Sequence, residues 1–315
     1  MNERSAPVVS LRSLTRDFGT TRAVDCLTFD VAPGELFGIV GPDGAGKTTT
    51  LRMLAGVLRP TAGDATIAGL SVTQDPEAVK PHIAYMSQRF GLYADLTVRE
   101  NIEFYADLYH VPKSDRPARL ERLYQFSALG QFKDRLAGKL SGGMKQKLAL
   151  CCALIHHPEV MLLDEPTFGV DPISRRDLWL ILHEMVADGM TVLVSTAYLD
   201  EAERCDRVGL LHHGHVVALD TPDNLQQRFQ GDIYAVQTDN PRHTRDLLRQ
   251  HSNVRDAVLF GDTVHATMDD HIRDWPAARQ ILESEGVSIL SEGLVEPTLE
   301  NVFIELVGSR EARDA

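Results

Sequence analysis

Short apolar runs recur along the chain and are separated by segments in which hydrophobic residues follow helical spacing. After the first of these runs, Leu51, Leu54 and Ala55 keep the i, i+3, i+4 spacing of a helix. Strands that alternate with helices predict a mostly parallel α/β sheet. The apolar runs that predict its buried strands are residues 35–41, 83–88, 160–164 and 191–195.

Local capping signals place the boundaries of the predicted helices. Thr97 and Glu100 have the spacing of a capping box and begin a helical stretch. Asp171, which is followed by proline, predicts the N-cap of a later helix, and Gly189 ends that helix. Because two amphipathic helical segments lie between the second and third strands, residues 89–138 are predicted to form a helical insert.

The pattern of polar and apolar residues changes after about residue 225. Just before this point, an apolar stretch predicts a hairpin that turns at Gly214. After it, strand-like and helical segments follow one another in the order β-α-β-β-α-β, which is typical of a small ferredoxin-like unit. We therefore expect two domains, residues 1–225 and residues 226–315.

The composition narrows the range of partners and compartments. The 315 residues carry a formal net charge of −13, and an acidic chain is a poor candidate for sequence-independent nucleic-acid binding, which needs a basic surface. The four cysteines form neither a disulfide framework nor a paired metal motif, which favours a reducing compartment. The first residues lack the apolar core of a signal peptide, and no apolar run is long enough to cross a bilayer. We expect a cytoplasmic protein with no nucleic-acid partner.

A glycine-rich loop between the first strand and the following helix carries the strongest chemical signal. Residues 41–48, GPDGAGKT, match the phosphate-binding pattern G-x-x-x-x-G-K-[ST]. The glycines let successive backbone N–H groups and the helix N-terminus point at a chain of phosphates. In this pattern Lys47 reaches the β- and γ-phosphates, and the Thr48 hydroxyl is a ligand of Mg²⁺. The loop therefore predicts a site for a phosphate chain with Mg²⁺.

Two carboxylates follow the third predicted strand. Asp164 ends this strand, where a carboxylate beside a phosphate-binding loop can hold Mg²⁺ directly or through water. Glu165 lies one residue further toward the terminal phosphate, which suits a residue that orients or deprotonates an attacking water. An Asp-Glu pair by itself is a weak signal, and it becomes a strong one beside the phosphate-binding loop.

Residues 140–146, LSGGMKQ, carry a resemblance to a known family. The segment is similar to the signature of ATP-binding-cassette (ABC) ATPases, and it lies between the helical insert and the Asp-Glu strand, as in that family. Residues 8 to about 225 resemble the cassette throughout. The resemblance implies a P-loop NTPase cassette with a mixed sheet core and a helical subdomain, and it makes residues 226–315 an accessory α+β domain.

The resemblance also implies roles for individual residues. Glu165, Lys47 and Gln88 are expected to be catalytic, and Thr48, Gln88 and Asp164 are expected to hold Mg²⁺. Gln88 stands at the family's Q-loop, and Gly169 to Asp171 resemble the D-loop, which crosses the dimer interface. Phe18 stands where the family usually has a tyrosine that stacks on adenine. The residues expected to bind ATP are Phe18, Gly41, Asp43, Gly44, Ala45, Gly46, Lys47, Thr48, Thr49, Ser141, Gly142, Gly143, Gln146 and Asp171.

Two further segments resemble one branch of this family, the ATPase subunits of ABC-2-type exporters. They are STAYLDEAERCD, residues 195–206, and EPTLENVFIEL, residues 296–306. The branch implies two partners, an integral membrane permease and a second cassette, and a peripheral location on the inner face of the cell membrane. The aromatic residues Phe90, Tyr93 and Phe104 are candidates for contact with the permease.

Ala197 departs from the family's pattern. ABC ATPases usually carry a histidine at this position, in contact with the γ-phosphate and the catalytic glutamate. His212, His213 and His215 lie on the later hairpin, where a solvated turn is the favoured interpretation. One hypothesis is a weakly hydrolysing cassette that pairs with a different cassette, and the other is a homodimer in which Glu165 carries hydrolysis alone. A soluble cassette without a transporter and an ATP-binding regulator without turnover are the alternatives.

Overall fold

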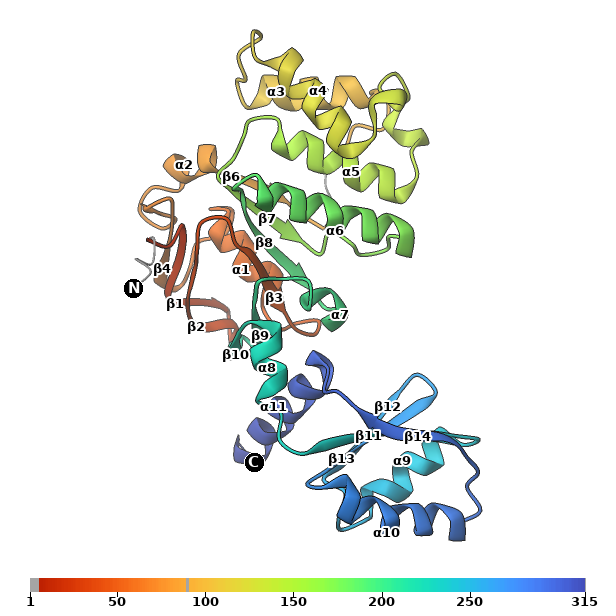
Figure 1. Ribbon diagram of the computed structural model, residues 1–315. Coiled ribbons are helices and arrows are strands. Elements are labelled where there is room, and N and C mark those ends of the chain that lie inside the picture. Colours follow the sequence, from red (N-terminus) through yellow and green to blue (C-terminus); the bar gives the residue numbers. More distant parts are fainter. Residues whose placement is uncertain (1–5, 89–90, 315) are drawn as a thin grey trace, which may run out of the picture. The chain divides into compact units, whose positions relative to one another are not determined.

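The computed structural model describes residues 6–88 and 91–314. Phe90 and the first two residues of the predicted helical insert lie outside these described residues. The chain divides into two compact units, Met1–Pro222 and Asp223–Ala315. Figure 1 shows the elements of each unit. None of the helices in the described part of the chain is long and apolar enough to cross a membrane.

A six-stranded sheet forms the centre of the first unit, with the strand order β10-β9-β3-β8-β7-β6 (Figure 1). Only β10 runs antiparallel to its neighbour, so the predicted mostly parallel sheet is confirmed. The register sets Asp164 beside Ser195 and Val40 beside Thr196, which brings the carboxyl ends of these strands together at one edge. The strands are β3 (Leu36–Val40), β6 (Ile83–Met86), β7 (Val160–Asp164), β8 (Thr191–Thr196), β9 (Arg207–His212) and β10 (His215–Asp220).

The apolar runs do not predict the second sheet of this unit, which is antiparallel with the order β2-β1-β4-β5. Register shifts between Leu11 and Leu14 break the alternation along its long first strand. The alternating burial of Leu27, Phe29 and Val31 is a period-2 signal for its second strand. Side chains of α1 (Lys47–Leu54) join those of both sheets in one apolar core. The strands are β1 (Val9–Phe18), β2 (Thr21–Val31), β4 (Ala62–Ile67) and β5 (Leu70–Ser71).

Helices α3, α4 and α5 lie together at one side of the first unit (Figure 1). The predicted capping box is present, since Thr97 Oγ1 accepts from Glu100 N at 3.2 Å and the Glu100 carboxylate accepts from Thr97 N at 2.8 Å. The helical region extends beyond the predicted insert, because α5 packs against α3 and α4. The helices of this unit include α2 (Pro76–Val79), α3 (Val98–Leu108), α4 (Arg116–Ser127), α5 (Gly142–Leu154), α6 (Pro172–Ala187) and α7 (Leu199–Ala202).

The second unit is an antiparallel sheet with the order β12-β13-β11-β14 and helices packed against it. Its own apolar core includes Val236, Val264, Trp275 and Leu282. Helix α8 (Pro222–Gln227) spans the boundary between the units in the sequence. The elements that follow it are β11 (Asp232–Thr238), α9 (Pro241–Arg249), β12 (Asp256–Phe260), β13 (Thr263–Met268), α10 (His271–Ser284), β14 (Ile289–Val295) and α11 (Leu299–Asp314).

Candidate functional site

The glycine-rich loop connects β3 to α1, and at two of its positions the neighbouring strands come too close for any side chain. Gly46 has φ +103°, and a Cβ atom there would lie 2.6 Å from the Ala23 carbonyl oxygen. A Cβ atom at Gly41 would lie 2.2 Å from the Leu211 carbonyl oxygen. Both distances are shorter than van der Waals contact permits, so β2 and β9 are packed directly against the loop. The loop is therefore held in shape by strands that are distant in the sequence.

The Lys47 side chain is folded back into this loop. Its ammonium group donates to the Gly41 carbonyl oxygen at 2.7 Å and to the Pro42 carbonyl oxygen at 3.1 Å. It also forms an ion pair with Glu165, with 3.2 Å between Nζ and Oε1. The side chain is only 4% exposed, so its charge is balanced mainly by these oxygens. A buried cation of this kind is ready to exchange one oxygen partner for a phosphate oxygen.

Asp164 is a buried carboxylate at the end of β7, and three hydroxyl groups donate to it. Thr48 and Ser195 donate to Oδ1 at 2.8 and 2.9 Å, and Tyr85 donates to Oδ2 at 3.3 Å. Burial and, after it, the Asp164 charge raise the pKa of Tyr85 to about 12, which keeps the phenol protonated as a donor. Thr48 and Asp164, separated by 116 residues in the chain, thus lie within one hydrogen bond of each other.

Glu165 follows in a left-handed backbone conformation, with φ +49°. Its N–H donates toward the Ser195 carbonyl and hydroxyl oxygens, at 3.2 and 3.0 Å, which holds this uncommon conformation in place. Its side chain joins the two other predicted catalytic groups: Oε1 pairs with Lys47, and Oε2 accepts from Gln88 Nε2 at 3.0 Å. The three predicted catalytic side chains therefore form one connected cluster.

An open pocket of about 510 Å³ lies over this cluster, within the size range of ordinary ligand sites. Phe18 is not among its lining residues. Phe18 is paired across the β1-β2 hairpin with Thr21, which does line the pocket, and the Arg16 guanidinium lies over its half-exposed ring at 4.6 Å. The lining residues are Thr21, Arg22, Ala23, Asp43, Gly44, Ala45, Gly46, Lys47, Thr48, Thr49, Gln88, Glu165 and His213.

The predicted signature segment lies apart from this pocket. Ser141 is the N-cap of α5 and accepts a hydrogen bond from the Met144 N–H at 3.3 Å. Ser141 and Gly142 are exposed, and neither they nor Gly143 and Gln146 line the pocket of about 510 Å³. Asp171 is the N-cap of α6, as predicted, and accepts from the Ser174 N–H at 3.0 Å. Hydrogen bonds from the Ser174 backbone and hydroxyl lower the pKa of this carboxyl.

Ala197 borders a smaller cavity of about 120 Å³ that reaches Glu165. Ala197 follows the last residue of β8 and is exposed, while Thr196 beside it is buried. The walls of this cavity also include Asp43, Thr167 and Tyr198. The chain thus leaves an open volume next to the predicted catalytic carboxylate at the position where a longer side chain was expected.

His213 lines the pocket, which the sequence did not predict. It occupies the turn between β9 and β10 with φ +46°, and Gly214 follows with φ +80°. Gly214 N–H donates to the Ala45 carbonyl oxygen at 3.1 Å, which fastens the turn to the phosphate-binding loop. The sequence signal was the hairpin itself, but only the order of the strands sets its turn beside the loop. The interpretation of His213 as part of a merely solvated turn is incomplete.

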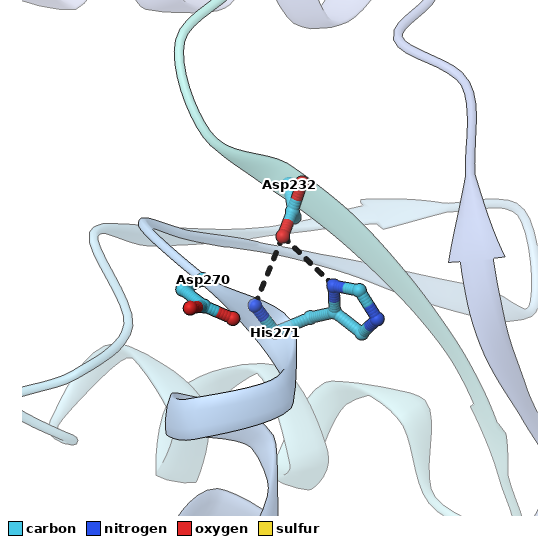
Figure 2. Close-up of side chains that lie close together, drawn as sticks. All are labelled: Asp232, Asp270 and His271. Atoms are coloured by element: carbon cyan, nitrogen blue, oxygen red, sulfur yellow. Dashed lines mark hydrogen bonds and ion pairs between the residues drawn. The ribbon is translucent and has the colours of Figure 1, made fainter.

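A second group of ionisable side chains lies in the other unit, around the start of α10 (Figure 2). One ligand atom from each of Asp232, Asp270 and His271 lies within 4.8 Å of the others. Asp232 accepts from the His271 backbone N–H and Nδ1 at 3.0 and 2.8 Å, and these bonds lower its pKa. Asp270 accepts from the N–H groups of Ile272 and Arg273 as the N-cap. Helix capping accounts for this arrangement.

Comparisons with known proteins agree with the geometry of the first unit. A family model described as ABC transporter matches residues 24–168. A probable multidrug ABC transporter ATP-binding protein of Escherichia coli (strain K12) is 42% identical over 96% of this chain. The match covers 52% of that relative, so the chain spans about half its length.

Another relative and a solved structure match over most of their own lengths. A daunorubicin resistance ATP-binding protein of Streptomyces coeruleorubidus is 36% identical over 98% of both chains. A solved ATP binding subunit of an ABC transporter superposes with a TM-score of 0.64 at 31% identity, covering 70% of this chain and 93% of that one. The phosphate-binding loop, the clustered side chains above it and these similarities lead to one assignment. The chain belongs to the family of ABC transporter ATP-binding proteins.

Proposed function

We propose that this chain binds ATP with Mg²⁺ and hydrolyses it to power export through a separate membrane subunit. One observation carries the proposal: Lys47, Gln88 and Glu165 form a connected cluster beneath a pocket that the phosphate-binding loop lines. Two relatives are named for multidrug transport and daunorubicin resistance, which supports export as the process that hydrolysis powers.

The oxygen atoms near the loop suit a small hard cation. Mg²⁺ prefers hydroxyl, carboxylate and amide oxygens, and Thr48 and Asp164 supply the first two within 2.8 Å of each other. Together with the amide of Gln88, these side chains would hold the ion. When bound, Mg²⁺ neutralises charge on the phosphate oxygens during transfer.

Glu165 is the candidate for activating water. Its carboxylate lies at the pocket wall, where Lys47 and Gln88 hold its two oxygens in separate directions. A phosphate chain that takes Lys47 as its partner would free Oε1 to accept a proton from water. The positioning of Glu165 therefore depends on the same lysine that binds the phosphates.

We propose that the second cassette supplies the signature segment that this pocket lacks. Ser141 and Gly142 are exposed and do not line the chain's own pocket. On either side of the Asp171 cap, Phe168 is 57% exposed and Ile173 is 77% exposed. Such exposed apolar side chains beside an N-cap favour an interface. In the proposed dimer, Ser141 of each cassette faces the ATP of the other.

The proposed contact with the membrane subunit lies beside Gln88. A hollow of about 350 Å³ separates Gln88 from α5, and Gln146 on α5 also lines it. Tyr93 and Phe104 form an exposed edge-to-face pair with ring centroids 4.6 Å apart. An apolar helix end of a membrane subunit would fit beside these rings, so that motion of Gln88 is passed to it. We propose that this contact holds the chain at the inner face of the cell membrane.

We further propose that the alanine at position 197 slows hydrolysis in the chain's own site. Ala197 carries only a methyl group, and the cavity of about 120 Å³ lies between it and Glu165. No longer side chain from this position is there to contact a γ-phosphate or Glu165. Loss of one preorganised contact to a transition state commonly lowers kcat by about 10²–10³-fold. The intact Lys47, Asp164 and Glu165 still permit binding and slow turnover.

The test is ATP turnover by the purified full-length chain, with and without the membrane proteins that co-purify with it. We expect Mg²⁺-dependent phosphate release that EDTA abolishes and that rises when the membrane subunit is present. A second cassette with histidine at the matching position among the co-purified proteins would identify a heterodimer, and its absence a homodimer. Tight ATP binding without turnover under all these conditions would refute the proposal of hydrolysis and favour an ATP-binding regulator. Turnover that no co-purified membrane protein raises would favour a soluble ATPase.

A further inference from the structure

Glu201 is a fully buried carboxylate that the proposed function does not use. It lies on α7, four residues after Ala197, and its relative exposure is 0%. Its Oε2 atom accepts hydrogen bonds from Thr196 Oγ1 at 2.7 Å and from Thr167 Oγ1 at 2.9 Å. Burial of a carboxylate is costly unless such partners are present, so its place here calls for an explanation.

The two threonines belong to the segments that border the small cavity beside Ala197. Thr196 Oγ1 also accepts from the Tyr198 N–H at 3.0 Å, which fixes the chain on both sides of Ala197. Thr167 lies two residues after Glu165, and the turn between them closes with a bond from Phe168 N to the Glu165 carbonyl oxygen at 3.1 Å. Through Oε2, Glu201 therefore ties the Glu165 turn to the strand end.

Arg175 connects the same carboxylate to the start of α6. Its Nε atom lies 3.4 Å from Glu201 Oε1, and its guanidinium carbon lies 4.7 Å from the centre of the Tyr198 ring. Among the described residues, none donates a hydrogen bond of good geometry to Oε1, although that atom is buried. Arg175 follows the Asp171 cap by one helical turn. The ion pair thus reaches the segment that we propose to face the second cassette.

We infer that Glu201 is a positioning residue for ATP hydrolysis: it holds the Glu165 turn at a set distance from the strand end at Thr196 and links both to α6. The inference rests on the proposed function. Glu201 does not line either the pocket of about 510 Å³ or the cavity beside Ala197, so it acts through other residues. The shared acceptor Oε2 sets the geometry, because one oxygen atom fixes the Thr196 hydroxyl at the end of β8 and the Thr167 hydroxyl in the turn after β7.

The test compares Glu201→Gln, Thr196→Val and Thr196→Ser with the wild-type chain. Glu201→Gln removes the charge at nearly constant volume, and Thr196→Val removes the hydroxyl that donates to Oε2 and accepts from the Tyr198 N–H. We expect kcat to fall about 10- to 100-fold in both, as for misplacement of a reacting group by a fraction of an ångström to one ångström. The Kd for ATP should stay within about two-fold, since the phosphate-binding loop is untouched. Thr196→Ser keeps the hydroxyl and should restore wild-type turnover.

Two further measurements separate positioning from simple loss of folding. The double variant Glu201→Gln with Thr196→Val should have nearly the same kcat as the less active single variant, because both substitutions act on the contact between positions 196 and 201. Hydrogen exchange at the Tyr198 and Phe168 amides should be faster in Glu201→Gln, whether or not the chain turns over ATP. Asp200→Asn, an exposed neighbour on α7, is the matched control and should leave kcat and exchange unchanged.

The outcomes that test the role of Glu201 differ from those that test the proposed function. No ATP turnover by the wild type, with membrane proteins present, counts against hydrolysis, and amide exchange then decides the role of Glu201. Wild-type kcat and exchange in Glu201→Gln would overturn the inference while leaving the proposed function intact. A parallel loss of ATP binding, kcat and thermal stability in Thr196→Val would also overturn it, because it would show a purely structural role.

Discussion

Replacement of Glu165 by glutamine is the most direct test of how this site works. The side chain keeps its volume and one carbonyl oxygen, but it loses the ability to accept a proton. In the structure the carboxylate is bound on both sides, by Lys47 at 3.2 Å and by Gln88 at 3.0 Å. The substitution therefore removes a base and releases a cation in one step.

The loss of the base lowers kcat, whereas the release of Lys47 strengthens ATP binding. Loss of a general base commonly lowers kcat by about 10²–10⁴-fold, or ~3–5 kcal/mol in activation free energy. In the proposed site ATP competes with Glu165 for Lys47, and one hydrogen bond to a charged group contributes about 1.5–3 kcal/mol. Release of Lys47 can therefore tighten ATP binding by at most about 10- to 100-fold. We expect an increase in affinity of about 10-fold, because the carbonyl oxygens of Gly41 and Pro42 continue to hold the Lys47 ammonium group.

The assay combines steady-state phosphate release, ATP affinity in the presence of Mg²⁺, and light scattering for mass. Glu165→Gln should bind ATP at least as well as wild type, release almost no phosphate and form an ATP-dependent dimer. Glu184→Gln, an exposed carboxylate on α6, is the control and should behave as wild type. Turnover by Glu165→Gln within about three-fold of wild type would refute the base assignment, since that role predicts a loss of at least ~10²-fold. A monomer at saturating ATP would refute a homodimer with shared sites.

The other predictions concern binding, turnover and pH. Lys47→Ala should weaken ATP binding by about 10²-fold, because the phosphates lose a charge-assisted donor; nucleotide titration checks this, and unchanged affinity would contradict it. Ala197→His should raise kcat by at least about 10-fold if the missing side chain limits hydrolysis, and equal turnover in steady-state assays would exclude that limit. Burial lowers the pKa of His156, so the unfolded chain binds its proton more readily and stability falls as pH drops below about 6.5. His156→Gln should lose less thermal stability than wild type between pH 7.5 and 5.5 in melting experiments, and an equal loss would count against this contribution.

The sequence by itself determined the features that depend on neighbouring residues. The spacing of glycines, lysine and threonine in residues 41–48 specifies a phosphate-binding loop because successive backbone groups form it. The capping box at Thr97 and the N-cap at Asp171 are likewise interactions within one helical turn. Buried parallel strands are apolar on both faces, so runs such as residues 160–164 and 191–195 stand out clearly. The order of these elements and the resemblance to ABC ATPases follow from such local signals.

Only the tertiary structure decided which side chains share the site. Strand order brings Asp164 to Thr48 and the turn at His213 to the phosphate-binding loop, and no local pattern encodes that order. The antiparallel sheet of the first unit escaped prediction because register shifts interrupt the alternation of its first strand. In the sequence, Glu201 is one of several acidic residues within 195–206. In the structure, it is the one that is buried and bonded to Thr167 and Thr196. Hydrogen bonds between segments far apart in the chain depend on how strands pair and how helices pack, which is why the structure was needed to find them.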